Sequence, residues 1–305
     1  MILTFPNGQE VDVVFDEVAH SYVVAHKLAD GQFSDYRPTH GITAPLAVVP
    51  KAFLTPWGAK VGVEALLEYQ VGQPMDSAYL TKFFADKKAM DDNERYIDAK
   101  GKDKPVMSYY GFSKKYPWFS KVKGAYKQKS KEGQEAGIWL HSAVEQFYKS
   151  GRKTLPIISE ETQPVWDSFI MFDNFFKPKA DKDGLEFLVY SLMFGYSGQG
   201  DFRGTMSGKT CIGDWKTTNR SDQNQDGIST EYFFQLGGLA QAEFERTGVW
   251  VDDLFAANFD KQGGEPRVTW ASEFGMSPQD CARAYISGFN TYHMIETWDY
   301  KFKQK

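Results

Sequence analysis

The sequence predicts a mixed α/β fold. Three observations indicate it: helical and strand patterns alternate from residue 133 onward, the 305-residue chain can bury a large core, and its composition is that of an ordinary globular protein. Hydrophobic residues make up 42% of the chain and charged residues 25%, which excludes wholesale disorder, a collagen-like repeat and a coiled coil. We expect one or two domains.

The first part of the chain differs from the rest. Residues 1–36 read as a short β-meander, because the runs VDVVF and HSYVVAH are separated by turn residues. Three prolines precede a helical pattern within residues 43–70, and residues 76–131 are polar, lysine-rich and aromatic. We predict an N-terminal extension over residues 1–132 and a compact core over residues 133–305.

The core is predicted from capping and turn signals as well as from periodicity. Glycine at position 151, for example, suits the C-cap of a preceding helix. The expected elements are, in order, a helix at 137–149, a helix at 161–176, a strand at 185–194, a hairpin at 198–217, a helix at 231–246, a strand at 251–259 and a helix at 277–298.

The hairpin is the most informative stretch. A two-residue turn at Ser207-Gly208 is plausible because glycine supplies the positive φ that such turns need. The resulting register places Asp201 directly across from Asp214, where two carboxylates repel each other. A divalent cation between them would relieve this repulsion, and Mg²⁺ prefers such oxygen ligands.

Residues beside the two carboxylates extend this chemistry. Lys216 shares a strand face with Asp214, so its ammonium can orient an attacking water or stabilise phosphate charge. Trp215 points to the opposite face, where it can pack in the core. Arg203 shares the face of Asp201 and could touch a phosphate. An ordinary hairpin with solvated charges is the alternative interpretation.

Two helices carry further polar residues. His141 and Glu145 lie four residues apart beside an apolar stripe of the helix at 137–149. Such a histidine is more often structural, although imidazole is a competent ligand for Mn²⁺ or Mg²⁺. In the helix at 231–246, Gln235 could donate to a phosphate. The pair Gly237-Gly238 is costly in a helix unless the helix packs closely on the sheet.

In their order along the chain, these motifs resemble the PD-(D/E)XK nuclease superfamily, specifically its RecB-type branch with phage and mitochondrial genome-maintenance exonucleases. The resemblance rests on four motifs: G-x-x-x-H-x-x-x-E from Gly137, G-x-x-D from Gly198, D-x-K-T-T from Asp214, and the helix glutamine Gln235. Leu239 departs from the tyrosine that the family often has. Residues 1–60 match more weakly, through a motif that runs from Gly41-Ile42-Thr43 to Lys60, and residues 76–131 match nothing that we can name.

The resemblance implies a restriction-endonuclease-like core, with a central mixed sheet flanked by helices. It also implies one or two Mg²⁺ or Mn²⁺ ions, held by His141, Asp201, Asp214 and the Trp215 backbone carbonyl. Lys216 would be the catalytic lysine, with Glu145 and Glu186 as candidate accessory acids. The chain has two cysteines, so the four-cysteine iron–sulfur cluster of some members is not expected.

Charge is segregated along the chain. The net charge is −5, yet residues 100–131 hold ten lysines and one acid, so this stretch carries +9 and the remainder −14. Lysines interleaved with aromatic rings are typical of grooves for single-stranded nucleic acid. We predict that residues 76–131 form a cap or arch over the active site; an amphipathic helix packed by its aromatics is the alternative. The DNA-binding candidates are Gln235, Arg203, Thr217, Lys114, Lys115, Lys121, Lys123, Tyr116 and Trp118.

The predicted function is that of a divalent-metal-dependent DNA exonuclease with a phage-type role in replication or recombination. Its expected partner is DNA, as a single strand or duplex end, and a single-strand annealing or binding protein is a candidate protein partner. An endonuclease on the same core and a non-catalytic DNA-binding recombination partner are alternatives. No secretory signal pattern is present, and the longest uncharged stretch has 14 residues, so we expect a cytoplasmic protein without a membrane partner.

Overall fold

The computed structural model describes residues 1–48, 77–92, 94–98, 100–218 and 229–303. Contacts divide the chain into two compact units, Met1–Pro50 with Glu135–Lys305, and Lys51–Gln134. The helix expected within residues 43–70 lies almost wholly outside the described residues, as does most of the weaker motif at 41–60. The grouping of residues 1–132 into one functional extension stays a prediction, while the contacts assign residues 1–50 to the larger unit.

The larger unit begins with the predicted β-meander. Strands β1 (Ile2–Thr4), β2 (Glu10–Asp16), β3 (Ser21–His26) and β4 (Arg37–Gly41) pair antiparallel in sequence order. The alternation of β2 turns Val11 and Val13 inward, where they pack with Val24 and Tyr190. The short helix η1 (Ala44–Val48) follows β4.

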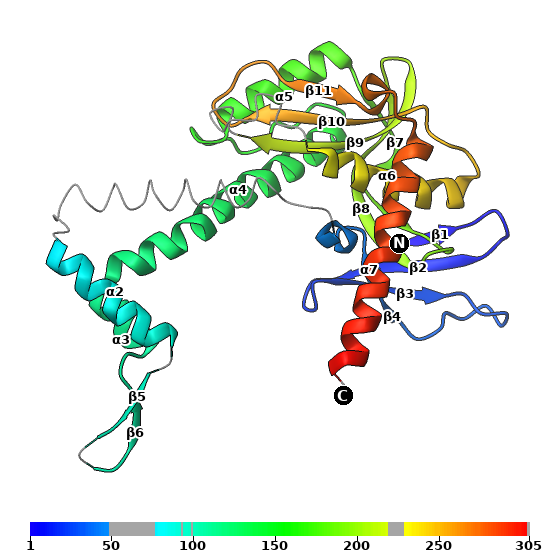
Figure 1. Cartoon of the computed structure of the whole chain (residues 1–305). Helices are drawn as coiled ribbons and strands as arrows, with labels where there is room; N and C mark the ends of the chain where they lie inside the picture. Colours follow the sequence, from blue (N-terminus) through cyan, green and yellow to red (C-terminus); the bar gives the residue numbers. More distant parts are fainter. Residues whose placement is uncertain (49–76, 93, 99, 219–228, 304–305) are drawn as a thin grey trace. The chain divides into compact units, whose positions relative to one another are not determined.

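This meander joins one mixed nine-stranded sheet in the described part of the chain, with the order β1-β2-β3-β4-β8-β9-β10-β11 and β7 paired to β8 (Figure 1). The further strands are β7 (Lys179–Tyr190), β8 (Tyr196–Met206), β9 (Lys209–Thr218), β10 (Asp253–Asp260) and β11 (Arg267–Trp270). The β4–β8 and β9–β10 pairs are parallel, and the other pairs are antiparallel. The predicted mixed α/β fold is confirmed at this level.

Helices cover both faces of the part of this sheet formed by β7 to β11 (Figure 1). Residues 135–149 of α4 (Pro117–Lys149) and helix α5 (Gln163–Phe176) pack on one face through a cluster that includes Phe147, Phe169 and Trp215. Helices α6 (Thr230–Thr247) and α7 (Pro278–Lys303) pack on the other through Leu239 and Tyr285. A short helix, η2 (Ala271–Phe274), follows β11. The larger unit therefore has a helix–sheet–helix arrangement.

The sequence signals at the helix ends agree with the structure. Gly151 follows α4 with φ +65°, and α6 begins after Ser229, whose hydroxyl accepts from the Glu231 N–H. The close packing expected of Gly237-Gly238 is present, but its partner is α7 and not the sheet. A Cβ at Gly237 would lie 2.3 Å from the backbone carbonyl of Cys281, so only glycine fits there.

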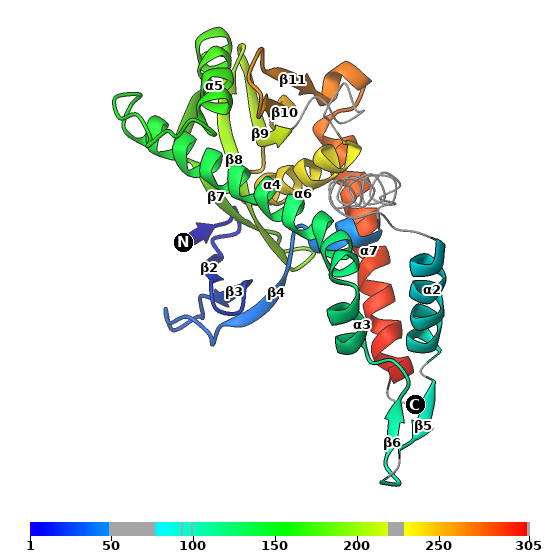
Figure 2. The same cartoon turned by 90° about the vertical axis from the view of Figure 1, so that its left-hand side faces the viewer.

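Over the residues that the structure describes, the smaller unit is helical with one β-hairpin. It holds α2 (Ser77–Asp91), β5 (Arg95–Ile97), β6 (Asp103–Pro105), α3 (Tyr109–Lys115) and the first part of α4. Figure 2 shows the β5–β6 hairpin extending beyond the ends of α2 and α3. Phe83, Phe112, Tyr116 and Trp118 form its buried cluster. Across the described residues of both units, none of the helices combines the length and the apolar character that a membrane span requires.

Candidate metal and nuclease site

Strand β8 changes its neighbours along its length. One edge pairs with β7, from Thr205 back to Ser197. The other edge pairs with β9 at residues 202–206 and with β4 at residues 196–197. Within the described chain, this second edge has no ladder partner over residues 198–201, and the sheet splits there.

The side-chain alternation of β8 also breaks at this split. Gly200 packs toward Leu239 of α6, and Arg203 pairs with Glu243 of the same helix. Positions three residues apart on a regular strand face opposite sides of the sheet. The two positions face the same helix here, so the regular alternation of β8 is interrupted between them.

Strand β7 shows the same change of face opposite Asp201. Leu185 packs toward the cluster beneath α4 and α5, whereas Phe187 packs beneath α6 and α7. Glu186 lies between them with φ +48°, a left-handed conformation that is uncommon for a residue other than glycine. Such local strain concentrates at functional sites, because the surrounding structure must hold it in place.

The hairpin of β8 and β9 has the predicted turn and register. Ser207 and Gly208 have φ values of +53° and +78°, the positive pair of a type I′ turn. The ladder runs from Met206–Lys209 to Phe202–Gly213. It stops one pair short of Asp201 and Asp214. The prediction that these two residues form a ladder pair is therefore wrong.

In place of that pair, the backbone N–H of Trp215 donates to Asp201 Oδ2 at 2.7 Å. The Asp201 side chain thus satisfies a backbone donor where the two strands part. The Trp215 ring is 1% exposed and packs in the cluster beneath α5, as predicted. The predicted role of the Trp215 carbonyl as a metal ligand stays a prediction.

His141, Glu186 and Asp201 form one cluster. His141 Nδ1 lies 3.2 Å from Glu186 Oε1 and 3.3 Å from Asp201 Oδ1. One ligand atom from each of the three residues lies within 4.8 Å of the others. Gln199 Nε2 donates to Glu186 Oε2 at 2.7 Å and orients that carboxylate. Glu186, proposed from the sequence only as an accessory acid, is thus in direct contact with the histidine.

Asp214 and Lys216 lie on β9 beside this cluster. Lys216 Nζ is 2.5 Å from Asp214 Oδ2 and 5.2 Å from the centre of the Tyr232 ring of α6. Asp214 is only 5% exposed. Despite the approach of the ammonium, the buried Oδ2 has no hydrogen bond of ordinary geometry within the described chain. An acceptor of this kind has room for a further cationic partner.

Burial and neighbouring charges shift the pKa values of these groups in different directions. Burial lowers the pKa of His141, but Asp201 and Glu186 outweigh it and raise that pKa to about 10. Burial raises the pKa of Asp201, yet His141, Lys216 and the Trp215 N–H hold it below its usual value. At Asp214 burial prevails over Lys216, and with Asp201 nearby the pKa rises to about 7. Asp214 is therefore the carboxylate with the least compensation.

This donor set suits a divalent cation. Carboxylate oxygens are the ligands that Mg²⁺ prefers, and Mn²⁺ also accepts imidazole. The observation of fit is the charge balance of the buried set: although Lys216 pairs with Asp214, burial and the neighbouring Asp201 still raise the pKa of Asp214 to about 7, as expected of a buried anion with too little positive charge around it. The residues that could hold such an ion are His141, Glu186, Asp201 and Asp214.

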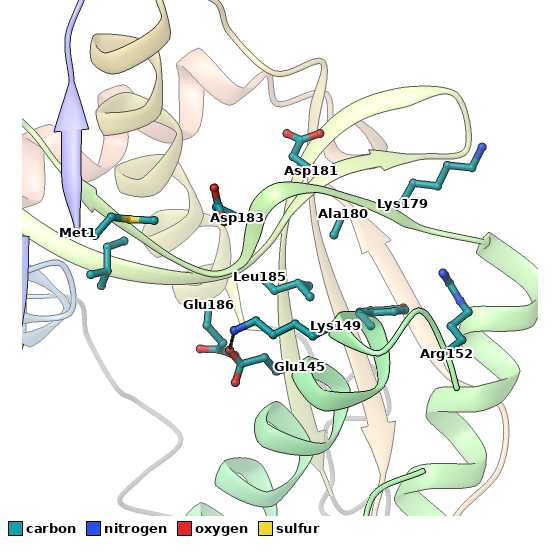
Figure 3. A pocket seen from close by; sticks show the side chains of 13 residues that line it. Met1, Glu145, Lys149, Arg152, Lys179, Ala180, Asp181, Asp183, Leu185 and Glu186 are labelled. Atoms are coloured by element: carbon teal, nitrogen blue, oxygen red, sulfur yellow. Dashed lines mark hydrogen bonds and ion pairs between the residues drawn. The ribbon is translucent and has the colours of Figure 1, made fainter. Parts of the chain in front are cut away.

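Two sequence candidates lie outside this cluster. Glu145 pairs with Lys149 at 2.5 Å on the next turn of α4. Figure 3 shows this pair beside Glu186 at a surface pocket of 560 Å³. Arg203 pairs with Glu243 at 2.8 Å and with the exposed Asp181 at 3.3 Å, so its guanidinium is engaged on the α6 side of the sheet.

Gln235 and Thr217 lie on elements that border the site. Gln235 is half-buried in α6, one turn after Tyr232. Thr217 follows Lys216 on β9, and its hydroxyl lies 4.0 Å from the position that a Cβ at Gly137 of α4 would occupy. Contact of Gln235 or Thr217 with DNA stays a prediction.

In the smaller unit, the predicted DNA-binding residues have different environments. Tyr116 and Trp118 are 2% and 7% exposed inside the aromatic cluster, which agrees with the alternative of a helix packed by its aromatics. Lys115 forms an ion pair with Asp86, and Lys114 is exposed. The side chains of Lys121 and Lys123 lie outside the described residues.

Comparisons with known proteins do not assign this chain to a family. No family model matches the sequence, and no curated protein matches it. Among solved structures, an alkaline exonuclease from Laribacter hongkongensis is similar over 53% of this chain and 84% of that chain, with 10% identity and a TM-score of 0.25. A likeness of this strength assigns neither a fold nor an activity to the chain.

Proposed function

We propose that this chain is a divalent-metal-dependent deoxyribonuclease of the PD-(D/E)XK type that hydrolyses phosphodiester bonds at DNA strand ends. One observation carries the proposal: a histidine, three carboxylates and a lysine from α4, β7, β8 and β9 meet where the sheet splits. Those residues are His141, Glu186, Asp201, Asp214 and Lys216.

The carboxylates have the properties of metal ligands. Asp201 and Asp214 are almost completely buried, and burial is unfavourable for two neighbouring anions. His141 and Lys216 compensate part of this charge, yet burial and the nearby Asp201 outweigh Lys216 and keep the pKa of Asp214 raised. A bound Mg²⁺ or Mn²⁺ ion would supply Lewis-acid stabilisation of phosphate charge and activation of the attacking water.

Lys216 has the position of a catalytic lysine. Its ammonium is half-buried and held between Asp214 and the face of the Tyr232 ring. Burial lowers its pKa, but Asp214 and Asp201 outweigh this effect and raise it, so the ammonium stays charged at neutral pH. A fixed cation beside the site can orient the attacking water and stabilise the charge of the transition state.

We further propose that the basic segment binds the DNA strand, as part of a phage-type replication or recombination nuclease that works with a single-strand annealing or binding protein. Lys114 is exposed at the end of α3. Because Tyr116 and Trp118 are buried, the exposed Tyr110 is the ring that suits stacking on a base.

The decisive experiment is digestion of 5′- and 3′-labelled DNA, single- and double-stranded, with Mg²⁺, Mn²⁺ or EDTA. We expect metal-dependent release of nucleotides, lost by about 100-fold or more in Asp214→Asn and in Lys216→Met. Glu145→Gln is the matched control, since Glu145 pairs with Lys149 outside the cluster. Circular dichroism checks that each variant is folded.

Cleavage that persists in EDTA, or either site variant digesting DNA at the wild-type rate, would refute the metal-dependent nuclease. Cleavage of closed circular DNA would instead identify an endonuclease on the same site. Metal-dependent DNA binding without cleavage of any of these substrates would identify a non-catalytic DNA-binding protein.

A further inference from the structure

A second group of metal-ligating side chains lies away from the nuclease site, between β4 and α7. His40 comes from β4, and His293 and Glu296 come from one turn of α7. One ligand atom from each lies within 4.8 Å of the others. We propose that these three residues form a structural site for a transition metal of the Zn²⁺ class.

The spacing of the donors fits an ion better than a direct contact. His40 Nδ1 lies 3.7 Å from Glu296 Oε2, beyond the range of a hydrogen bond. In tetrahedral coordination with bonds of about 2.1 Å, neighbouring ligand atoms are about 3.4 Å apart. The positions of His293 and Glu296, three residues apart on a helix, place both side chains on one face. The three side chains supply three of the four ligands, and a water molecule would take the fourth position.

The neighbouring rings hold His40 in place. Its ring makes edge-to-face contacts with Phe289, Tyr292 and His293, at centroid distances of 5.9, 6.0 and 5.6 Å. Tyr292 also donates its hydroxyl to Glu296 Oε1 at 2.5 Å. This bond occupies one carboxylate oxygen and leaves the other, Oε2, toward His40. Outer-shell bonds of this kind orient the ligands of metal sites.

The chemistry of the donors selects the metal. Two imidazoles and one carboxylate suit Zn²⁺, Co²⁺ or Ni²⁺, whereas Mg²⁺ prefers oxygen ligands and retains its water. The nuclease site has the opposite balance, with three carboxylates and one histidine. An excess of Mg²⁺ should therefore occupy the nuclease site and leave the second site to a transition metal.

The metal would connect β4 to α7. β4 is short and pairs with β8 at only two positions in the described chain, His40–Tyr196 and Gly41–Ser197. The Tyr285 hydroxyl of α7 already donates to the Ile42 carbonyl at 3.1 Å. A metal at His40 would add coordinate bonds to the ring contacts that His40 already makes with α7, and it would stabilise the folded state by mass action.

The test is Co²⁺ titration of the full chain in excess Mg²⁺, followed by visible absorption, with Zn²⁺ added to displace the Co²⁺. We expect one tight Co²⁺ site in the wild type and about tenfold or greater loss of affinity in His293→Gln and in Glu296→Gln. Both residues are exposed, so these variants should fold. Zn²⁺ should raise the melting temperature of the wild type and not that of His293→Gln.

Two controls separate this site from others. His20→Gln removes an exposed histidine of the meander and should bind Co²⁺ as the wild type does. Asp201→Asn should also retain this Co²⁺ site, so the result does not depend on the proposed nuclease. Wild-type affinity in both His293→Gln and Glu296→Gln, or a wild type that binds no Co²⁺ in excess Mg²⁺, would overturn the proposal.

Discussion

Asp201 accepts the backbone N–H of Trp215 at 2.7 Å, at the point where the β8–β9 ladder ends. The same carboxylate offers its other oxygen to His141 at 3.3 Å. Because Trp215 lies between Asp214 and Lys216, this bond ties the histidine cluster on one side of the split to the carboxylate and ammonium on β9. The Asp201–Trp215 hydrogen bond therefore lies at the split of the sheet and also connects the two halves of the site.

Glu186→Gln should weaken Mn²⁺ binding by about 10- to 100-fold. The substitution retains the shape of the side chain but removes one of the negative charges that face His141 and the proposed ion. Glu145→Gln is the matched control, because its carboxylate belongs to the same region but pairs with Lys149. Isothermal titration with Mn²⁺ measures both. Equal affinities in the two variants would remove Glu186 from the ligand set.

Gly237→Ala should reduce the free energy of unfolding by about 1–3 kcal/mol. The added Cβ would lie 2.3 Å from the Cys281 carbonyl, so α6 and α7 must move apart. Gly137→Ala in α4 is the opposite case, since its Cβ would meet only Thr217 Oγ1, at 4.0 Å. Alanine should stabilise that helix by about 0.5–1 kcal/mol. Urea unfolding of both variants measures the difference, and equal effects would contradict the packing of α6 on α7.

Local signals in the sequence predicted the type and order of most core elements, but the helix expected at 137–149 begins at residue 117, the strand expected at 185–194 covers 179–190, and β11 was not predicted. The turn at Ser207-Gly208 and the register up to Phe202–Gly213 follow from residues adjacent in the chain, and both are confirmed. The loss of the Asp201–Asp214 pair could not be predicted in this way. There the Asp201 side chain, and not the β8 backbone, accepts the Trp215 N–H, and the pattern of the sequence does not indicate this exchange.

The contact between Glu186 and His141 could not be predicted from the sequence pattern either. A regular strand would direct Glu186 by simple alternation, but β7 changes face there and the residue adopts a positive φ. The burial of Tyr116 and Trp118 was likewise not decided by composition. Aromatic rings among lysines suit either a nucleic-acid groove or a packed helix, and it is contacts with Phe83 and Phe112 that distinguish them.

Asp253→Asn should destabilise the protein at neutral pH by about 2–4 kcal/mol. Asp253 is 1% exposed, pairs with Lys209 at 2.7 Å and accepts the Leu254 N–H and both the hydroxyl and the N–H of Ser272. Burial alone would raise the pKa of Asp253, but these partners outweigh it and hold the pKa below its usual value.

The pH dependence of this effect has a definite sign. A carboxylate with a lowered pKa in the folded state stabilises that state above its unfolded pKa of about 3.8, and this stabilisation is lost as pH falls through the folded pKa. The stability difference between wild type and Asp253→Asn should therefore be largest near neutral pH and shrink toward pH 3. Urea unfolding across this range measures it, and a pH-independent difference would contradict an ionised Asp253.

The basic segment should determine how DNA binding depends on salt. A triple variant, Lys114→Gln, Lys121→Gln and Lys123→Gln, should weaken binding of single-stranded DNA and reduce the slope of log K against log salt by about 0.7 for each lost phosphate contact. Lys115 is left in place because its ion pair with Asp86 supports the helices of the smaller unit. The matched control replaces the exposed Lys153, Lys177 and Lys182, which changes the net charge equally.

Fluorescence anisotropy of a labelled strand, titrated at several salt concentrations in Ca²⁺ to prevent cleavage, compares the two variants. If the segment contacts the strand, the first variant loses about two units of slope and the control retains the wild-type slope. If net charge alone governs binding, both variants weaken it to the same extent, and the segment has no special role. Because the chain carries −5 overall, a difference between the variants would show that the local +9 of residues 100–131 attracts DNA against a repulsive remainder.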